Sequence, residues 1–377
     1  MARVGNPPFG TASATSSLMK PPSQRLLYLD WLRGIAALTM LQGHVFQSFL
    51  RNDLRSGGPY SMSQFAGGMP PAIFLFLLGV TFAFLMDSQE KKGVTPGARV
   101  LASMGRSGYL FAAAFAFRLQ LWLFSMDFGE WRNLFRVDIL NCMGLALLVM
   151  SVMAVFRTAE RVRLCAILGA AIAAASPLIS GTDLSGAPEL VRNYIIPDHN
   201  FFGFFPWAAF VAFGLSAGSI LRRLKPEDVA PTMQWLGWGG VALAFAAYTI
   251  SNMSSSIYAN SDFWLNSPAL IFIKLGAILI LVAFSWVWNL QLGPEQWSWV
   301  RQFGMTSLLV YWVHIELVYG RWLGAFKENL TVGETIAAAT AVIVLMLGLS
   351  LLRTNWAAVK AWGFGVFSPA PRRVSGD

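Results

Sequence analysis

Ten apolar segments separated by short polar connections run through the sequence and limit what the chain can fold into. An α-helix needs about 20 mostly apolar residues to cross roughly 30 Å of hydrocarbon. Within the bilayer every backbone polar group must be satisfied inside the segment, which favours helices. We therefore expect an all-α, polytopic membrane bundle of about ten (10–11) transmembrane helices. The segments cover approximately residues 27–50, 70–86, 108–126, 137–156, 163–180, 201–221, 233–251, 268–289, 304–323 and 334–352.

The composition excludes several other classes of protein. Of 377 residues, 55% are hydrophobic and 12% are charged, against about 25% charged in a typical soluble domain. An ordinary soluble enzyme, a disordered chain and a coiled coil are therefore excluded. The net charge of +9 is typical of a membrane protein with basic connections, so we expect no nucleic-acid partner. Cys142 and Cys165 both lie in apolar segments and predict neither a disulfide framework nor a metal site.

The distribution of basic residues predicts the orientation in the membrane. Of 28 Lys and Arg residues, 18 fall in the two tails and the alternate connections, six in the other connections and four within spans. Cytoplasmic connections carry the excess of positive charge. We therefore expect both termini in the cytoplasm of a multi-pass protein of the cell (bacterial inner) membrane. The expected organisation is a disordered cytoplasmic tail (1–25), one transmembrane domain (26–353) and a cytoplasmic interfacial segment with a tail (354–377).

Ionisable side chains in the first apolar segment are the strongest candidates for a site. At about 100° per residue, Asp30, Arg33 and His44 fall on one helical face. Asp30 and Arg33, three residues apart, are expected to pair. Charged groups inside a membrane are costly, and they mark a functional site by default. The alternative is that the three residues only tie this helix to a neighbour.

The ninth segment carries a second polar face, which includes Tyr311 and His314. Glu316 is expected to point elsewhere on that helix. Two interpretations of this face are equally favoured: a ladder of hydrogen bonds between helices, or part of an active site. His314 is nevertheless the one intramembrane imidazole comparable to His44.

Several further polar residues are expected towards the outer half of the membrane. Arg118 and Lys274 are cations within spans and need counter-ions. Asp138 and Glu316 are the span carboxylates available to them. The candidates for binding substrate or for stabilising a developing oxyanion are Asp138, Asn141, Lys274, Tyr311 and Glu316. No P-loop or HExxH motif is present, and we expect no metal.

Four stretches together resemble the transmembrane acyltransferases, which include heparan-α-glucosaminide N-acetyltransferase, its bacterial relatives and the acyltransferase-3 family. Residues 29–36 (LDWLRGIA) resemble the first-span signature, and residues 71–79 (PAIFLFLLG) the second-span motif. Residues 138–144 (DILNCMG) and 304–314 (G-x-x-S-x-x-x-Y-x-x-H) are similar to later motifs of the glucosaminide branch. The resemblance covers roughly residues 26–325.

The resemblance implies transfer of an acetyl or other short acyl group from cytoplasmic acyl-CoA to an acceptor across the membrane, often a sugar amine or hydroxyl. In the acyltransferase-3 branch ten residues separate the first-span Arg from the catalytic His, as they separate Arg33 from His44 here. In the glucosaminide branch that His lies in the first outer loop, but residues 51–69 contain none. The implied catalytic residue is therefore His44, with His314 as the alternative.

The candidate side chains suit an acyl transfer, although two other functions compete with it. An imidazole can act as a general base or as a nucleophile near neutral pH. Asp30, Arg33 and Arg118 would bind acyl-CoA or form structural ion pairs. Acyl-CoA (acetyl-CoA) would be a co-substrate, with no cofactor held permanently. A proton-coupled secondary transporter and a non-catalytic membrane protein are the competing hypotheses. The acceptor, the acyl length and the oligomeric state, with a homodimer as one option, stay open.

Overall fold

The computed structural model describes residues 26–126, 131–253, 258, 261–292, 296–356 and 359–360. Within these residues the fold is built from α-helices and short 3-10 turns, and Leu50 and Leu330 form an isolated bridge rather than a strand. The predicted all-α, polytopic fold is confirmed. The elements are α1 (Leu27–Phe49), η1 (Asn52–Leu54), α2 (Gly58–Gly67), α3 (Pro70–Lys91), α4 (Pro96–Ser125), η2 (Trp131–Phe135), α5 (Ile139–Met150), η3 (Ser151–Val155), α6 (Thr158–Ser180), α7 (Glu189–Ile195), α8 (Phe204–Leu221), α9 (Pro226–Ser251), α10 (Pro268–Leu292), α11 (Trp299–Met305), α12 (Ser307–Tyr319), η4 (Gly324–Phe326) and α13 (Val332–Thr354).

Each predicted apolar segment corresponds to a helix or to a pair of consecutive helices. Seven helical stretches in the described residues are long and apolar enough to cross a membrane; these contain α3, α4, α5, α6, α8, α10 and α13. The other three predicted spans are α1, α9 and the α11–α12 pair. Polar side chains lower the hydropathy of α1, and α12 has only 13 residues. A count of ten spans therefore stays a prediction.

The ninth predicted span is wrong in one respect, because it is two helices. Thr306, with φ −121° and ψ 20°, separates α11 from α12. The hydroxyl of Thr306 lies 2.5 Å from that of Ser350 on α13, and Gln302 also donates to Ser350. Side-chain bonds to α13 thus accompany the interruption of the main-chain helix. α12 is consequently a separate helix from α11, and it packs against α1.

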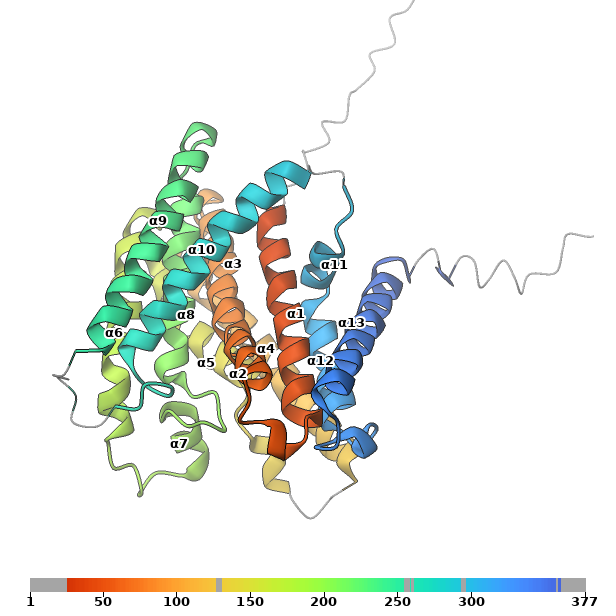
Figure 1. The fold of residues 1–377 in the computed structure, drawn as a ribbon. Helices are drawn as coiled ribbons and strands as arrows, with labels where there is room; N and C mark the ends of the chain where they lie inside the picture. The colour runs from red at the N-terminus through yellow and green to blue at the C-terminus, as the bar shows by residue number, and fades with distance from the viewer. Residues whose placement is uncertain are drawn as a thin grey trace, which may run out of the picture.

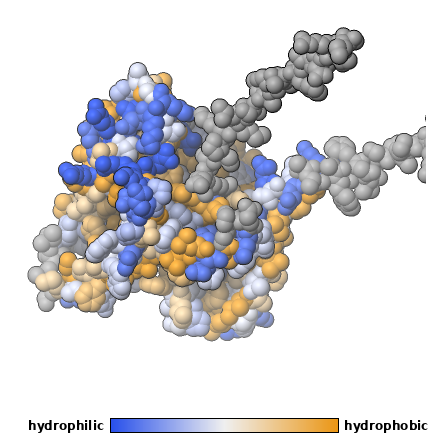
Figure 2. Space-filling model, turned by 90° about the horizontal axis from the view of Figure 1, so that it is seen from above, coloured by the Kyte–Doolittle hydropathy of each residue, from blue (hydrophilic) through white to orange (hydrophobic). Residues whose placement is uncertain are grey.

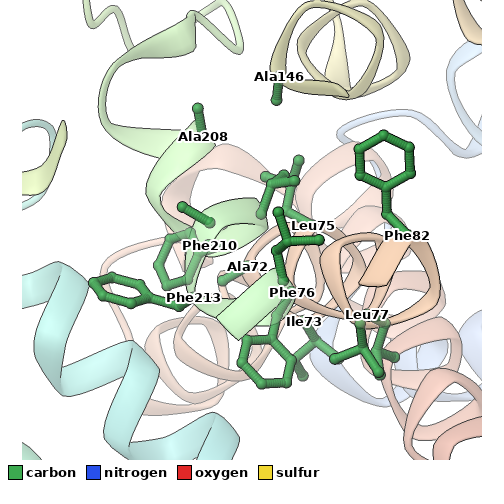
Figure 3. Close-up of a cluster of buried hydrophobic side chains, with 14 of the residues drawn as sticks. Ala72, Ile73, Leu75, Phe76, Leu77, Phe82, Ala146, Ala208, Phe210 and Phe213 are labelled. Atoms are coloured by element: carbon green, nitrogen blue, oxygen red, sulfur yellow. The ribbon is translucent and has the colours of Figure 1, made fainter. Parts of the chain in front are cut away.

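The main hydrophobic core lies where α3 packs against α8 and α5 (Figure 3). Phe76 from α3 and Phe210 from α8 are both almost fully buried there. Two glycines allow the α3 and α8 backbones to touch. A Cβ atom on Gly79 would lie 2.1 Å from the carbonyl oxygen of Val211, and one on Gly214 would lie 1.9 Å from that of Phe76. Small residues allow such close approach of packed membrane helices.

A second core holds α1 against α11, α12 and α13, in the right half of Figure 1. Here too glycines set the spacing. A Cβ atom on Gly34 would lie 1.9 Å from the carbonyl oxygen of Val300, and one on Gly304 would lie 1.8 Å from that of Asp30. α1 begins and α13 ends at the same, upper side of the molecule (Figure 1). This packing fixes the face that α1 turns towards the rest of the bundle.

A buried ionic network joins the ends of α3, α6 and α8. Asp87 accepts from Arg222 Nε at 2.7 Å and pairs with Lys91 at 3.0 Å, while Glu90 pairs with Arg161 at 3.2 Å. Arg161 has no exposed surface. Seen from above (Figure 2), this end of the molecule carries a broad hydrophilic area beside hydrophobic side chains. Lys91 and Arg222 are thus engaged by a carboxylate of their own chain.

Candidate active site

Two histidines from opposite ends of the chain lie in contact at the junction of α1 and α12. Nδ1 of His44 is 2.9 Å from Nε2 of His314, and the ring planes are nearly parallel, with an angle of 12° and centroids 5.2 Å apart. His314 is fully buried, and its Nδ1 lies 2.7 Å from the carbonyl oxygen of Val310. The ring of Tyr319 meets His44 edge-on at 5.4 Å. The two imidazoles that the sequence singles out therefore form one unit.

His44 faces a cavity of about 960 Å³ enclosed by α1, α3, α4, α5 and α12. From α1 the lining residues are Arg33, Met40, His44 and Gln47, a spacing of one helical face. Their 14-residue separation corresponds to roughly 21 Å along the helix axis. The prediction that Arg33 and His44 share a face is confirmed. Ala37 and Leu41 lie on the neighbouring side of α1 and pack against the second core.

Arg33 marks one end of this cavity and pairs with Asp30. Nη1 of Arg33 donates to Oδ1 of Asp30 at 3.0 Å, as the i, i+3 spacing predicts. Asp30 is buried, whereas the Arg33 side chain is 23% exposed and lines the cavity. Asp30 thus holds the Arg33 side chain in place, while the Arg33 guanidinium stays accessible to a ligand in the cavity.

Arg118 and Asp138 form the second ion pair of the lining. Nε of Arg118 donates to Oδ2 of Asp138 at 3.0 Å, and both residues line the cavity. Asn141 completes the capping box of α5 with Asp138 and donates to the hydroxyl of Tyr194 at 2.8 Å. Burial raises the pKa of Tyr194, which lies on α7 outside the predicted spans. Asn141 therefore supports the wall and is not itself among the lining residues.

α12 contributes Tyr311 and Glu316 to the lining, on either side of its buried His314. Glu316 is 7% exposed, and its Oε1 accepts from Trp322 Nε1 at 2.9 Å. Its Oε2 has no hydrogen-bond partner within the described part of the chain. Glu316 lies about 140° around α12 from Tyr311, and the cavity wraps around enough of α12 to reach both residues.

Lys274 lies apart from the other predicted site residues. Its Nζ donates to the carbonyl oxygen of Gly68 at 3.1 Å and sits 5.1 Å from the centre of the Trp207 ring. It is not among the residues that line the cavity. A carbonyl dipole and an aromatic face replace the carboxylate that the sequence suggested as its counter-ion.

The far end of the cavity contains lining residues outside the set of predicted site residues. Arg136, His199, Arg321 and Lys327 all reach it from connecting segments. Lys327 donates to the carbonyl oxygen of Tyr319 at 2.7 Å, and His199 lies 3.4 Å from Asp262. Arg136, His199 and Lys327 lie in loops without helical periodicity, so no pattern in the sequence assigns them to a common wall. Arg321 lies in the predicted span 304–323, at helical spacing from Tyr311 and His314, and His199 lies just before the predicted span 201–221.

A pair of imidazoles in contact, one lining a cavity and the other buried behind it, is chemically suited to moving a proton or an acyl group. The fold is that of a polytopic integral membrane protein. The profile described as heparan-alpha-glucosaminide N-acetyltransferase, catalytic, matches residues 25–263. The chain therefore belongs to this family of membrane acetyltransferases, for which acetyl-CoA is the co-substrate. No curated protein matches it significantly.

The matched range contains His44, Arg118 and Asp138 but ends before α10. The late motif of residues 304–314, part of the resemblance noted above, lies outside it. Contact with His44, rather than the family match, therefore connects His314 to the site.

Proposed function

We propose that the protein transfers an acetyl or other short acyl group from cytoplasmic acyl-CoA to an extracytoplasmic acceptor, a carbohydrate amine or hydroxyl, with His44 as the catalytic residue. The observation that carries this proposal is that one cavity is lined by Arg33, His44 and the distal Arg321 and Lys327. Under the predicted topology, Arg33 lies towards the cytoplasm and the other end opens to the outside. An acyl donor and an acceptor could therefore meet at His44 from opposite sides.

Four of the lining residues have a proposed chemical role in this reaction. The imidazole of His44 removes the proton of the acceptor amine or hydroxyl, or takes the acyl group itself. Arg33 offers a cation for the acyl donor. Tyr311 and Arg118 lie in the lining as donors for the oxyanion that forms at the thioester carbonyl. Asn141 and Lys274 lie outside the lining, which makes them poorer candidates for that task.

The test uses purified full-length protein with labelled acetyl-CoA and a panel of amino sugars and glycans analysed by mass spectrometry. A positioned general base contributes about 10²–10⁴-fold. His44→Ala should therefore reduce transfer by at least about a hundredfold, with acetyl-CoA binding nearly intact. Thr39→Ala is a matched control, because Thr39 lies on the same helix and its hydroxyl donates to the backbone carbonyl oxygens of Ile35 and Ala36 within that helix.

The two roles of His44 predict different intermediates. A nucleophile forms an acetylated enzyme from acetyl-CoA alone, and His44→Ala forms none. A base gives no adduct and needs both substrates together. If the wild-type protein neither binds nor consumes acyl-CoA, the acyltransferase proposal fails and proton-coupled transport becomes the better hypothesis. If His44→Ala keeps normal turnover, the site has to be rebuilt around another residue.

A further inference from the structure

The hydrogen bonds of His314 determine which of its nitrogens carries a proton. Nδ1 of His314 lies 2.7 Å from the carbonyl oxygen of Val310. A carbonyl oxygen can only accept, so Nδ1 must be the donor. In a neutral ring the other nitrogen, Nε2, then carries the lone pair. The main chain of α12 thereby fixes the tautomer of His314.

The tautomer of His314 in turn determines that of His44. Nδ1 of His44 lies 2.9 Å from Nε2 of His314, and a lone pair at Nε2 requires His44 to donate. With the proton of His44 on Nδ1, its Nε2 is left with the lone pair. The alternative requires a doubly protonated His314. That cation would be fully buried, and no carboxylate of the described residues forms an ion pair with it, which makes this state costly.

We propose that His314 is a positioning residue that sets the tautomer of His44, so that Nε2 of His44 is the reacting atom. This inference rests on the proposed function and assigns one atom within it. His44 lines the cavity, whereas His314 does not. His314 therefore acts through His44 rather than on a substrate. A neutral imidazole here occupies the place that a carboxylate has behind the histidine of a Ser–His–Asp triad.

In general-base catalysis, Nε2 of His44 carries the proton from the acceptor to the leaving thiolate. Nε2 of His44 takes the proton of the acceptor O–H or N–H, and the acceptor atom forms its new bond to the thioester carbonyl carbon. The carbon–sulfur bond breaks, and the sulfur leaves with its electron pair. It then receives the proton from Nε2 to give the free thiol of CoA. Throughout the step, Nδ1–H of His44 keeps donating to His314, which holds the ring in place.

The tautomers can be observed directly, because the chain contains only three histidines. We would label the full-length protein with ¹⁵N-histidine and record nitrogen NMR spectra at about pH 8, above the usual imidazole pKa of about 6.5. His314→Gln and His199→Gln assign the signals. Both His44 and His314 should show a protonated Nδ1 and an unprotonated Nε2. A His44 that carries its proton on Nε2 overturns the inference, whatever the activity.

Kinetics provide the second test. His314→Leu removes the acceptor for His44 Nδ1, so kcat should fall about a hundredfold while KM for both substrates stays within about twofold. His314→Gln offers an amide oxygen at similar reach and should recover part of kcat. If both variants lose activity only in proportion to lost thermal stability, the role is structural and the proposal fails. A wild-type protein with the expected tautomers but no acyl transfer refutes the proposed function instead.

Discussion

Asp138 uses its two carboxylate oxygens for two different structural tasks. Oδ2 accepts from Nε of Arg118 on α4 at 3.0 Å, while Oδ1 accepts from the backbone N–H groups of Leu140 and Asn141 at 3.0 and 3.2 Å. The first contact closes the cavity wall between α4 and α5. The second caps the first turn of α5. Substitutions at this one position can therefore separate the ion pair from the cap.

Asp138→Asn should keep the cap and lose the ion pair, because Asn caps helices about as well as Asp. We expect a loss of about 1.5–3 kcal/mol of unfolding free energy, the range for a hydrogen bond to a charged group. Asp138→Ala should cost about 1 kcal/mol more, since the cap is lost as well. Unfolding in detergent measures both. Asp183→Asn is the matched control, because exposed Asp183 accepts from the backbone N–H of Ser185 and forms no ion pair with any residue that the structure describes. Equal losses for the Asn and Ala variants would show that the cap contributes nothing.

Arg33→Ala should weaken acyl-CoA binding by about tenfold, which corresponds to about 1.4 kcal/mol, and should affect acceptor binding much less. The reason is that Arg33 presents a cation at the end of the cavity assigned to the donor. Asp30→Asn removes its partner while keeping that cation, so donor affinity should be largely retained. CoA affinity and thermal stability must be measured on the same samples. A variant that loses stability without a selective loss of donor affinity would make Arg33 a structural tie.

Gly304→Ala should destabilise the protein, because the added Cβ would lie 1.8 Å from the carbonyl oxygen of Asp30 and must push α11 away from α1. Overpacking of this kind costs about 1–3 kcal/mol. Gly348→Ala on α13 is the matched control, since nothing lies within 4 Å of its added Cβ. That variant should be neutral or gain about 0.4–1 kcal/mol. Thermal unfolding of the two variants tests the sign of each effect, and a stable Gly304→Ala protein would contradict the close packing of these helices.

Reporter fusions after Asp377 and within residues 181–200 should report opposite compartments, with the first in the cytoplasm. The physical reason is the 18-to-6 bias of basic residues towards one set of connections and the tails. An alkaline phosphatase and a fluorescent protein fusion at each site provide complementary signals. Two fusions on the same side would contradict the predicted topology, and opposite compartments with the C-terminal fusion outside would reverse the donor and acceptor ends of the cavity.

Much of the fold follows from local patterns in the sequence. Apolar segment length is enough to find the helices, and the i, i+3 spacing is enough to pair Asp30 with Arg33. Helical periodicity also predicts the shared face of Arg33 and His44, because that face depends on one helix only. The domain boundaries in the tails lie largely outside the described residues and stay predictions.

Features that depend on two distant segments could not be predicted in this way. The contact between His44 and His314 depends on the packing of α1 against α12, for which single-helix periodicity carries no information. The break at Thr306 depends on its partner Ser350 on α13. Lys274 was expected to need a carboxylate, but a carbonyl oxygen and the Trp207 ring come from elements that are remote in sequence.

The histidine pair also has a consequence for how the protein is made. His44 and His314 are 270 residues apart, which at 5–20 residues per second corresponds to roughly 15–55 s of translation. During that interval α1 has been synthesised, but the ring that orients His44 has not yet emerged from the ribosome. A nascent or truncated chain that ends before α12 therefore contains Arg33 and His44 but no completed histidine pair. Under the proposed function, an acyl donor would meet a complete site only after α12 has also been synthesised.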